Sequence, residues 1–171
     1  MSFKRYIVED LVEPELAVEY PPPPESDEPQ VHERYRRACK ERVIEALAAL
    51  FDRSGQIRNL SKFTREFKQR ENASTSAIGG GIAIPHLRSM QPRRLVVAVA
   101  RSTPGLEYLA PDEKPVHLFF CLTAPPYDDR LYLRFHRWVA AELIAETWLI
   151  EALMQATSAH EMVKILRGLY Y

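Results

Sequence analysis

Hydrophobic residues in the first half of the chain recur at helical spacing. Val43, Leu47 and Leu50 follow one another at three- and four-residue intervals, which places them on one face of a helix. Gly55 comes shortly afterwards, and glycine commonly ends a helix. This pattern predicts a helix over residues 31–51.

A second segment with this spacing covers residues 59–70, where Leu60, Phe63 and Phe67 share one side. Its last turn carries basic side chains, which suit the negative end of a helix dipole. The segment therefore predicts a second helix. Residues 71–81 follow it and are rich in Ser, Thr and Gly, a composition that predicts a loop.

The central region contains two apolar runs that are too short for helices. Residues 95–100 read Leu-Val-Val-Ala-Val-Ala, and residues 116–122 form a second, nearly continuous run. Such runs are typical of strands that are covered on both faces. Pro104-Gly105 lies between the runs and predicts a turn.

The last third of the chain returns to helical spacing. Leu133, His136 and Val139 share a face, which predicts a long helix over residues 130–147. Residues 158–161 read Ser-Ala-His-Glu, which is the pattern of a capping box. They predict the start of a final helix.

The N-terminal region combines short apolar runs with a polar insertion. Residues 3–20 hold two such runs, around residues 6–8 and 16–18, and predict a short helix or turn followed by a strand. Residues 21–30 hold five prolines and three acidic residues, which predict an exposed, inserted loop. Because strands alternate with helices and no repeat is present, we expect one α/β domain over residues 1–171. Its core would be a single mixed β-sheet with helices on both faces.

The composition narrows the possible functions. Lys and Arg total 23, as do Asp and Glu, so the protein lacks the basic field that recruits nucleic acid. No apolar stretch is long enough to span a bilayer, and the N-terminus lacks a signal peptide's apolar core. We therefore expect a cytoplasmic protein. Cys39 and Cys121 are far apart, which favours reduced thiols over a disulfide or a zinc site. We expect neither a metal nor a cofactor.

The most unusual stretch is residues 79–86, Gly-Gly-Gly-Ile-Ala-Ile-Pro-His. Glycine allows positive φ and a close approach of the backbone to a ligand. Pro85 donates no hydrogen bond, so a regular strand or helix should end there. His86 is then expected to leave the core on a stiff support, as a nucleophile would. Its reference pKa of about 6.5 leaves the imidazole largely neutral at cellular pH.

These residues resemble the active-site segment of a known family, the fructose/mannitol-type (type 2) enzyme IIA domain. This domain belongs to the phosphoenolpyruvate-dependent sugar phosphotransferase system, and nitrogen-regulatory IIA proteins share its pattern. The likeness extends over residues 36–168. It is carried by Arg70-Glu71-Asn72, Ser74-Thr75 and residues 78–86, and is supported by Thr103-Pro104-Gly105-Leu106 and Pro115-Val116.

The resemblance implies a phosphoryl carrier, that is, a phosphotransferase component. His86 would accept a phosphoryl group from a histidine phosphocarrier protein, either HPr or its nitrogen-type relative. It would then pass the group to a IIB domain that feeds a sugar transporter. In regulatory members, the phosphorylation state is instead reported to a target such as a kinase or transporter.

A phosphorylated His86 would carry about two negative charges, by analogy with other phosphorylated side chains, and these need donors. Arg70 is the candidate cation, because a guanidinium offers planar, permanent charge to phosphate oxygens. The candidate neutral donors are two hydroxyls and two backbone amides close by in the sequence: Ser74, Thr75, Gly80 and Gly81.

The chain departs from the family pattern near the histidine. Family members usually have a second histidine early in the helix after the last major strand, and Tyr132 occupies that position here. Tyrosine can donate a hydrogen bond to phosphate but carries no positive charge at pH 7. His136 lies one turn further along the same face, and we expect it to reach the site only if the helix shifts. Leu87 replaces a small residue and is expected to narrow partner access.

Three functions are compatible with these residues. The first is a phosphotransferase component that transfers a phosphoryl group through His86. The second is a regulatory binding module, in which phosphorylation only changes affinity for a target. The third is a degenerate scaffold that keeps the fold without transfer. Tyr132 and Leu87 favour the third, whereas Arg70 and His86 argue against it.

Overall fold

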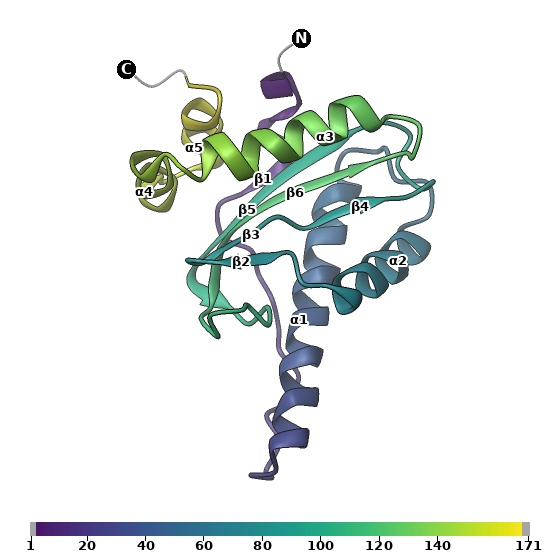
Figure 1. Cartoon of the computed structure of the whole chain (residues 1–171), viewed down its shortest axis with the longest axis vertical. Helices are drawn as coiled ribbons and strands as arrows, with labels where there is room; N and C mark the ends of the chain where they lie inside the picture. Colours follow the sequence, from purple (N-terminus) through teal and green to yellow (C-terminus); the bar gives the residue numbers. More distant parts are fainter. Residues whose placement is uncertain (1–2, 169–171) are drawn as a thin grey trace.

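The computed structural model describes residues 3–168; residues 1–2 and 169–171 of the predicted domain lie outside the described residues. Within residues 3–168, six strands form one sheet between two layers of helices (Figure 1). The strands are β1 (Val12–Glu13), β2 (Ala77–Gly79), β3 (Ile82–Ala83), β4 (His86–Arg88), β5 (Val96–Leu106) and β6 (Val116–Ala124). The helices are α1 (Pro29–Asp52), α2 (Leu60–Ala73), α3 (Asp129–Trp138), α4 (Thr147–Gln155) and α5 (Ala159–Leu166).

The sheet is mixed. Its order is β1-β5-β6-β3-β2, and β4 also pairs with β6. β5 and β6 are antiparallel, whereas β1 pairs with β5, and β3 and β4 pair with β6, in parallel. Helices α1 and α2 cover one face, and α3, α4 and α5 cover the other (Figure 1). The predicted α/β architecture, a single mixed sheet with helices on both faces, is confirmed.

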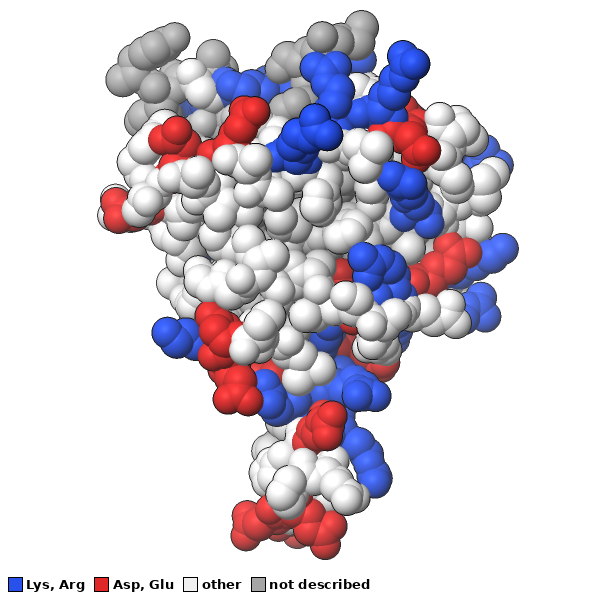
Figure 2. All heavy atoms as spheres, viewed as in Figure 1, with Lys and Arg blue, Asp and Glu red and all other residues white. Residues whose placement is uncertain are grey.

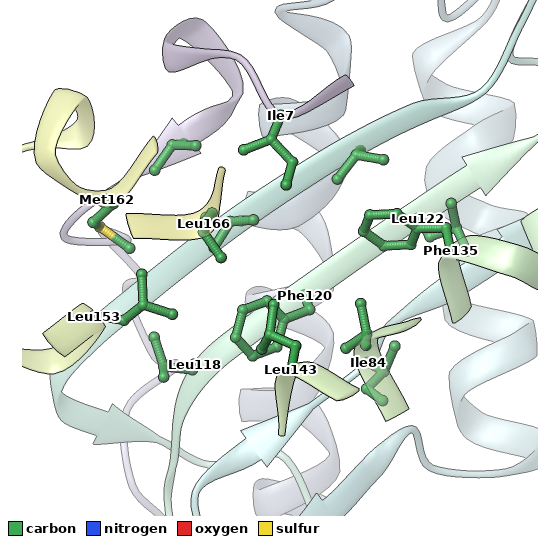
Figure 3. Packing of buried hydrophobic residues seen from close by; sticks show 14 of the residues in the cluster. Ile7, Ile84, Leu118, Phe120, Leu122, Phe135, Leu143, Leu153, Met162 and Leu166 are labelled. Carbon is green, nitrogen blue, oxygen red and sulfur yellow. The ribbon is translucent and has the colours of Figure 1, made fainter. Parts of the chain in front are cut away.

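Both faces of the central strands are buried, as their continuous apolar runs predict. Because successive side chains point to opposite faces, β6 contributes to two separate clusters. Leu118, Phe120 and Leu122 pack under the layer of α3, α4 and α5, whereas Phe119 and Cys121 pack against α1 and α2. Figure 3 shows the first of these clusters, with side chains of β6 against those of α3 and the following helices.

The predicted helix over residues 31–51 is α1, which begins two residues earlier than expected. Pro29 and Gln30, assigned to the loop over residues 21–30, form its first turn, and proline suits this position because its missing N–H needs no partner there. Residues 29–38 contain no buried residue. This half of α1 projects from the rest of the molecule (Figure 1), and acidic side chains gather at its tip (Figure 2).

The loop predicted over residues 71–81 is wrong in part. Helix α2 continues to Ala73, and β2 forms within the segment and pairs with β3. Pairing with a neighbouring strand overrides the local preference of such a polar stretch. Gly80 and Gly81, both with positive φ, make the turn between these two strands.

Three further expectations need correction. The predicted helix over residues 130–147 is interrupted: α3 ends at Trp138 and a π-helix covers Val139–Leu143 before α4 begins. Pro104-Gly105 makes no reversal, because β5 continues through it with a register shift and pairs with β6 again at Leu106. The strand expected near residues 16–18 lies instead at β1, after two 3-10 turns.

The final helix begins as the capping box predicts, since the Ser158 side chain accepts a hydrogen bond from the Glu161 backbone N–H. At the C-terminal end of the preceding helix, α4, the buried side chain of Arg101 in β5 donates to the main-chain carbonyls of Leu153 and Ala156, at 2.8 and 2.6 Å. These bonds tie α4 to the sheet. In the part of the chain that the structure describes, no helix has both the length and the apolarity to cross a bilayer.

Candidate functional site

His86 lies at a break in the sheet. β3 ends at Ala83, before Pro85, as predicted. The chain does not leave the sheet there, however, because β4 starts at His86 and pairs with β6 along the same edge. The Pro85 carbonyl accepts a hydrogen bond from Leu122 N at 3.0 Å, which holds the residue before His86 on the sheet. The support under the histidine is therefore main-chain pairing on a central strand.

The two nitrogens of the His86 ring have different surroundings. Nδ1 lies 2.6 Å from the carbonyl oxygen of Ile84, and a carbonyl can only accept, so Nδ1 carries the proton. Nε2 then carries no proton and keeps its lone pair, and it lies 3.2 Å from Nη2 of Arg70. Because a guanidinium is always protonated, Arg70 is the donor in this contact. This arrangement fixes one tautomer of the neutral ring.

Arg70 reaches the histidine from the last turn of α2, and its Nη1 donates to the Ser74 carbonyl at 3.2 Å. The pKa of His86 is lowered chiefly by burial, and the positive charges of Arg70 and Arg88 lower it further, although the bond to Ile84 opposes these effects. The ring is thus held neutral at physiological pH. Arg70, the predicted cation, and His86, the predicted nucleophile, are in direct contact.

A pocket of about 380 Å³ opens beside the exposed edge of His86. Its lining comes from α2, β4 and α3, and consists of Arg70, His86, Leu87, Arg88, Tyr132, Leu133 and His136. A cluster of basic and aromatic side chains around one imidazole can bind a small anion such as a phosphoryl group.

His136 reaches the site without any shift of the helix, so that expectation is wrong. Its ring centroid lies 4.8 Å from that of His86, closer than the ring of Tyr132 at 6.2 Å. Both side chains project from the same face of α3, one turn apart, and this face borders β4. Burial lowers the pKa of His136, and the neighbouring His86 lowers it further. Burial raises the pKa of Tyr132 to about 12, so its hydroxyl keeps its proton.

Arg88 is a site residue that the sequence reasoning missed. Its guanidinium lies 4.6 Å from the centre of the Tyr132 ring, and Nη1 lies 3.2 Å from Oδ1 of Asp129. In a strand, residues two apart point to the same face, so Arg88 follows His86 into the pocket. The sequence signal for Arg88 was its position two residues after His86, but using that signal required the expectation of a strand after Pro85.

Leu87 contributes to the pocket lining, but the structure does not show it narrowing partner access as expected. It lies between two residues that face the pocket, so its side chain points to the other side of β4. There it is 7% exposed and packs in the cluster against α1 and α2. Strand alternation therefore makes this bulky side chain part of the core.

Four other predicted donors lie outside the pocket lining. The Thr75 hydroxyl accepts from the Ala77 N–H. Ser74 contacts Arg70 through its main chain: its carbonyl accepts from Nη1, and its N–H donates to the Arg70 carbonyl. Gly80 donates its N–H to Asp112 at 3.0 Å, and Gly81 accepts from the main chain of β6. The glycines therefore build the β2–β3 turn, whose tip points away from β4 (Figure 1). The Gly80 amide is thus engaged by Asp112, and neither Gly80 nor Gly81 lines the pocket around His86.

Glu71, the residue that follows Arg70, forms a buried ion pair with Lys40. Nζ of Lys40, on α1, lies 3.7 Å from Oε2 of Glu71, and these side chains are 2% and 0% exposed. The same ammonium donates to the Glu71 carbonyl at 3.0 Å, while Oε2 accepts from Ser76 N at 3.2 Å. Burial lowers the pKa of Lys40 and raises that of Glu71, and the attraction between the two opposes both shifts.

This pair is linked to the histidine through the main chain. Glu71 holds the N–H of Ser76, the Ser76 carbonyl accepts from Ile84 N at 3.0 Å, and the Ile84 carbonyl holds Nδ1 of His86. Glu71 is also covalently next to Arg70. The buried Glu71 carboxylate thus links the main-chain segment that holds His86, the predicted nucleophile, to the end of α2 that carries Arg70, the predicted cation. Among residues 3–168, no group of three or more His, Cys, Asp or Glu side chains could hold a metal ion.

Comparison with known proteins places this site in a family. Residues 31–168 match the family model for "Phosphoenolpyruvate-dependent sugar phosphotransferase system, EIIA 2". The chain belongs to this family. The match covers α2 to α5, all of α1 except its first two residues, and every described strand except β1, and it includes each residue that lines the pocket around His86.

The curated relatives of this chain include phosphotransferase-system components and nitrogen regulatory proteins. The "PTS system fructose-specific EIIA component" of Haloferax volcanii is 30% identical over 75% of this chain and 83% of its own length. The "Nitrogen regulatory protein" of Klebsiella oxytoca is 32% identical over 80% of this chain and 82% of its own length. The "PTS system fructose-specific EIIABC component" of Bacillus subtilis is 28% identical over 74% of this chain, which spans 20% of that longer protein.

Solved structures share the EIIA 2 fold. The nitrogen regulatory protein IIA-Ntr of Neisseria meningitidis superposes with a TM-score of 0.71 at 23% identity, over 95% of this chain and 97% of its own. The IIA component in a complex of enzyme IIAMTL and phosphorylated enzyme IIBMTL from Escherichia coli gives 0.59 at 17% identity, over 75% and 88%. At such identities the likeness concerns the fold.

Proposed function

We propose that this protein is a phosphoryl carrier whose acceptor atom is Nε2 of His86. One observation carries the proposal: Nδ1 is held by the Ile84 carbonyl, while Nε2 faces the pocket beside Arg70. A neutral imidazole with one nitrogen tied to the main chain can attack only through the other. Membership of the EIIA 2 family supports the reaction class.

In the proposed reaction, the Nε2 lone pair attacks the phosphorus atom of a phosphohistidine on the donor protein. The N–P bond of the donor breaks as the new N–P bond forms, and its electron pair returns to the donor imidazole. Throughout, the proton stays on Nδ1 of His86, which donates it in the hydrogen bond to the Ile84 carbonyl. Arg70 donates to Nε2 at 3.2 Å before the reaction, so its guanidinium would release this lone pair and donate to the phosphoryl oxygens as charge builds on them.

We assign supporting roles to the two α3 residues in the pocket. Tyr132 would donate its hydroxyl proton to a phosphoryl oxygen, because its raised pKa keeps the proton in place. His136 would approach the phosphoryl group from the side of its neighbour's ring, 4.8 Å away. It thereby takes the place near the acceptor that the family's second histidine usually fills, from a position one turn later.

The proposed donor is a histidine phosphocarrier protein, either HPr or its nitrogen-type relative, in the cytoplasm. The proposed recipient is a IIB domain, because a family member forms a complex with a phosphorylated IIB enzyme. A second candidate function is regulatory: the chain is 32% identical to a nitrogen regulatory protein, and its phosphorylation state would then be read by a kinase or transporter. Both functions use the same site.

The test is phosphorylation with phosphoenolpyruvate, enzyme I and a phosphocarrier, followed by intact mass measurement. We expect an acid-labile gain of one phosphoryl group in the wild type, none in His86→Ala, and slow labelling in Arg70→Ala. Labelling that persists in His86→Ala would refute the choice of acceptor. A wild-type protein that its own carriers never label would act as the degenerate scaffold. Labelling without transfer to any IIB domain would favour the regulatory function.

A further inference from the structure

Arg88 is the second arginine in the pocket, and its present partners are weak. The side chains of Arg88 and Asp129 are 40% and 52% exposed, and their closest atoms are 3.2 Å apart. Solvent-exposed pairs of this kind contribute little to stability, because water and salt screen them. The guanidinium also lies 4.6 Å from the centre of the Tyr132 ring, a cation–π contact of modest strength. Arg88 is therefore available for exchange.

Phosphorylation of His86 would introduce a stronger competitor for Arg88. A phosphoryl group carries about two negative charges and three acceptor oxygens, against the single charge of Asp129. Arg88 projects from the same face of β4 as His86 and lines the same pocket. Its positive charge already contributes to the low pKa of the His86 ring, so the two side chains interact electrostatically. A guanidinium can bind a phosphoryl group through two parallel hydrogen bonds.

We propose that Arg88 is a second phosphate-binding residue, which exchanges Asp129 for the phosphoryl group when His86 becomes phosphorylated. This inference rests on the proposed function. Asp129 acts as the competitor that holds Arg88 in the unphosphorylated protein. It is the first residue of α3, where the helix dipole stabilises a negative charge after the arginine has left. The exchange leaves the Asp129 carboxylate beside the pocket without its cation, a difference that a partner protein can distinguish.

The experiment measures the equilibrium between the phosphocarrier and this protein, as the ratio of the two phosphorylated forms. Arg88→Ala is expected to shift the ratio away from this protein about 10-fold, through loss of a charged hydrogen-bonding partner. Arg88→Lys should give a smaller shift than Arg88→Ala, because lysine keeps the positive charge. Asp129→Asn should move the ratio the other way, about two- to five-fold, because it removes the competitor. The double variant should equal Arg88→Ala, since Asp129 acts only through Arg88.

The controls separate this proposal from the proposed function. Arg93→Ala removes an arginine that donates to the Gly55 carbonyl outside the pocket, and it should leave the ratio unchanged. A ratio that is unchanged in Arg88→Ala, or lowered equally by Asp129→Asn, overturns the exchange while His86 stays the acceptor. Failure to label the wild type, or labelling of His86→Ala, instead overturns the proposed function and the exchange with it.

Discussion

We predict that removing one partner of the buried Lys40–Glu71 ion pair strongly destabilises the protein. At an effective dielectric constant of about 20, unit charges 3.7 Å apart attract by roughly 4.5 kcal/mol. Replacing Lys40 by Met removes this attraction and leaves the Glu71 carboxylate buried without its counterion. Because breaking one side of a buried pair costs about 3–5 kcal/mol, we expect the free energy of unfolding to fall by that amount.

Urea denaturation of Lys40→Met measures the loss directly. In a thermal melt, at about 2–4 °C per kcal/mol for a chain of this size, the midpoint should fall by about 6–20 °C. Lys68→Met is the matched control. Its ion pair with Glu45 is 2.7 Å long but partly exposed, so its loss should cost less than about 1 kcal/mol.

The double variant Lys40→Met/Glu71→Gln tests the reason for the loss. With both charges removed, we expect much of the stability to return, giving a coupling energy of about 2 kcal/mol or more. A Lys40→Met variant no less stable than Lys68→Met would refute the reasoning. So would a double variant that loses the simple sum of the two single losses, because the two side chains would then act independently.

Three further predictions concern chemistry and stability. Protonation removes the His86 lone pair, and burial lowers the pKa of His86. The initial rate of phosphoryl acceptance should therefore fall on acidification with a midpoint below pH 6.5, and a midpoint above pH 6.5 attributable to His86 contradicts this. Arg101→Met should lower the free energy of unfolding by about 2–5 kcal/mol in urea, because buried carbonyls at the end of α4 lose their donor, and a loss below 1 kcal/mol contradicts it. Gly105→Ala should lower the melting midpoint far more than Gly80→Ala. Both glycines have positive φ, but only at Gly105 would a Cβ lie 2.5 Å from Pro115 Cβ, and equal midpoints contradict this.

Hydrophobic spacing predicted the large elements well and the small ones poorly. Helices α1 and α2 are long enough for a helical period to be visible, and strands β5 and β6 are long enough to show a continuous apolar run. β2, β3 and β4 have two or three residues each, and only pairing with neighbours defines them. The π-helix Val139–Leu143 continues a helical pattern without changing it, so the interruption between α3 and α4 left no visible signal.

The site was predictable where its chemistry is local in the sequence. The string ending at His86 and the family resemblance led to Arg70, and the structure brings the two into contact. The position of His136 was misjudged, because spacing along α3 gives the face of the helix but not its distance from the sheet. Lys40 and Glu71 are 31 residues apart, and charged residues in polar helices are usually exposed, so their burial was invisible.

The break between β3 and β4 has a consequence for the order of events in transfer. Both short strands are anchored to β6, and the Ile84 carbonyl holds the imidazole itself, so His86, the proposed acceptor, is held in a fixed position. For a reaction at Nε2, every incoming protein must bring its reacting atom to the same point, beside Arg70 and His136. Donor and recipient therefore need overlapping footprints and bind in turn. An excess of either one, in its unreactive form, should slow exchange with the other.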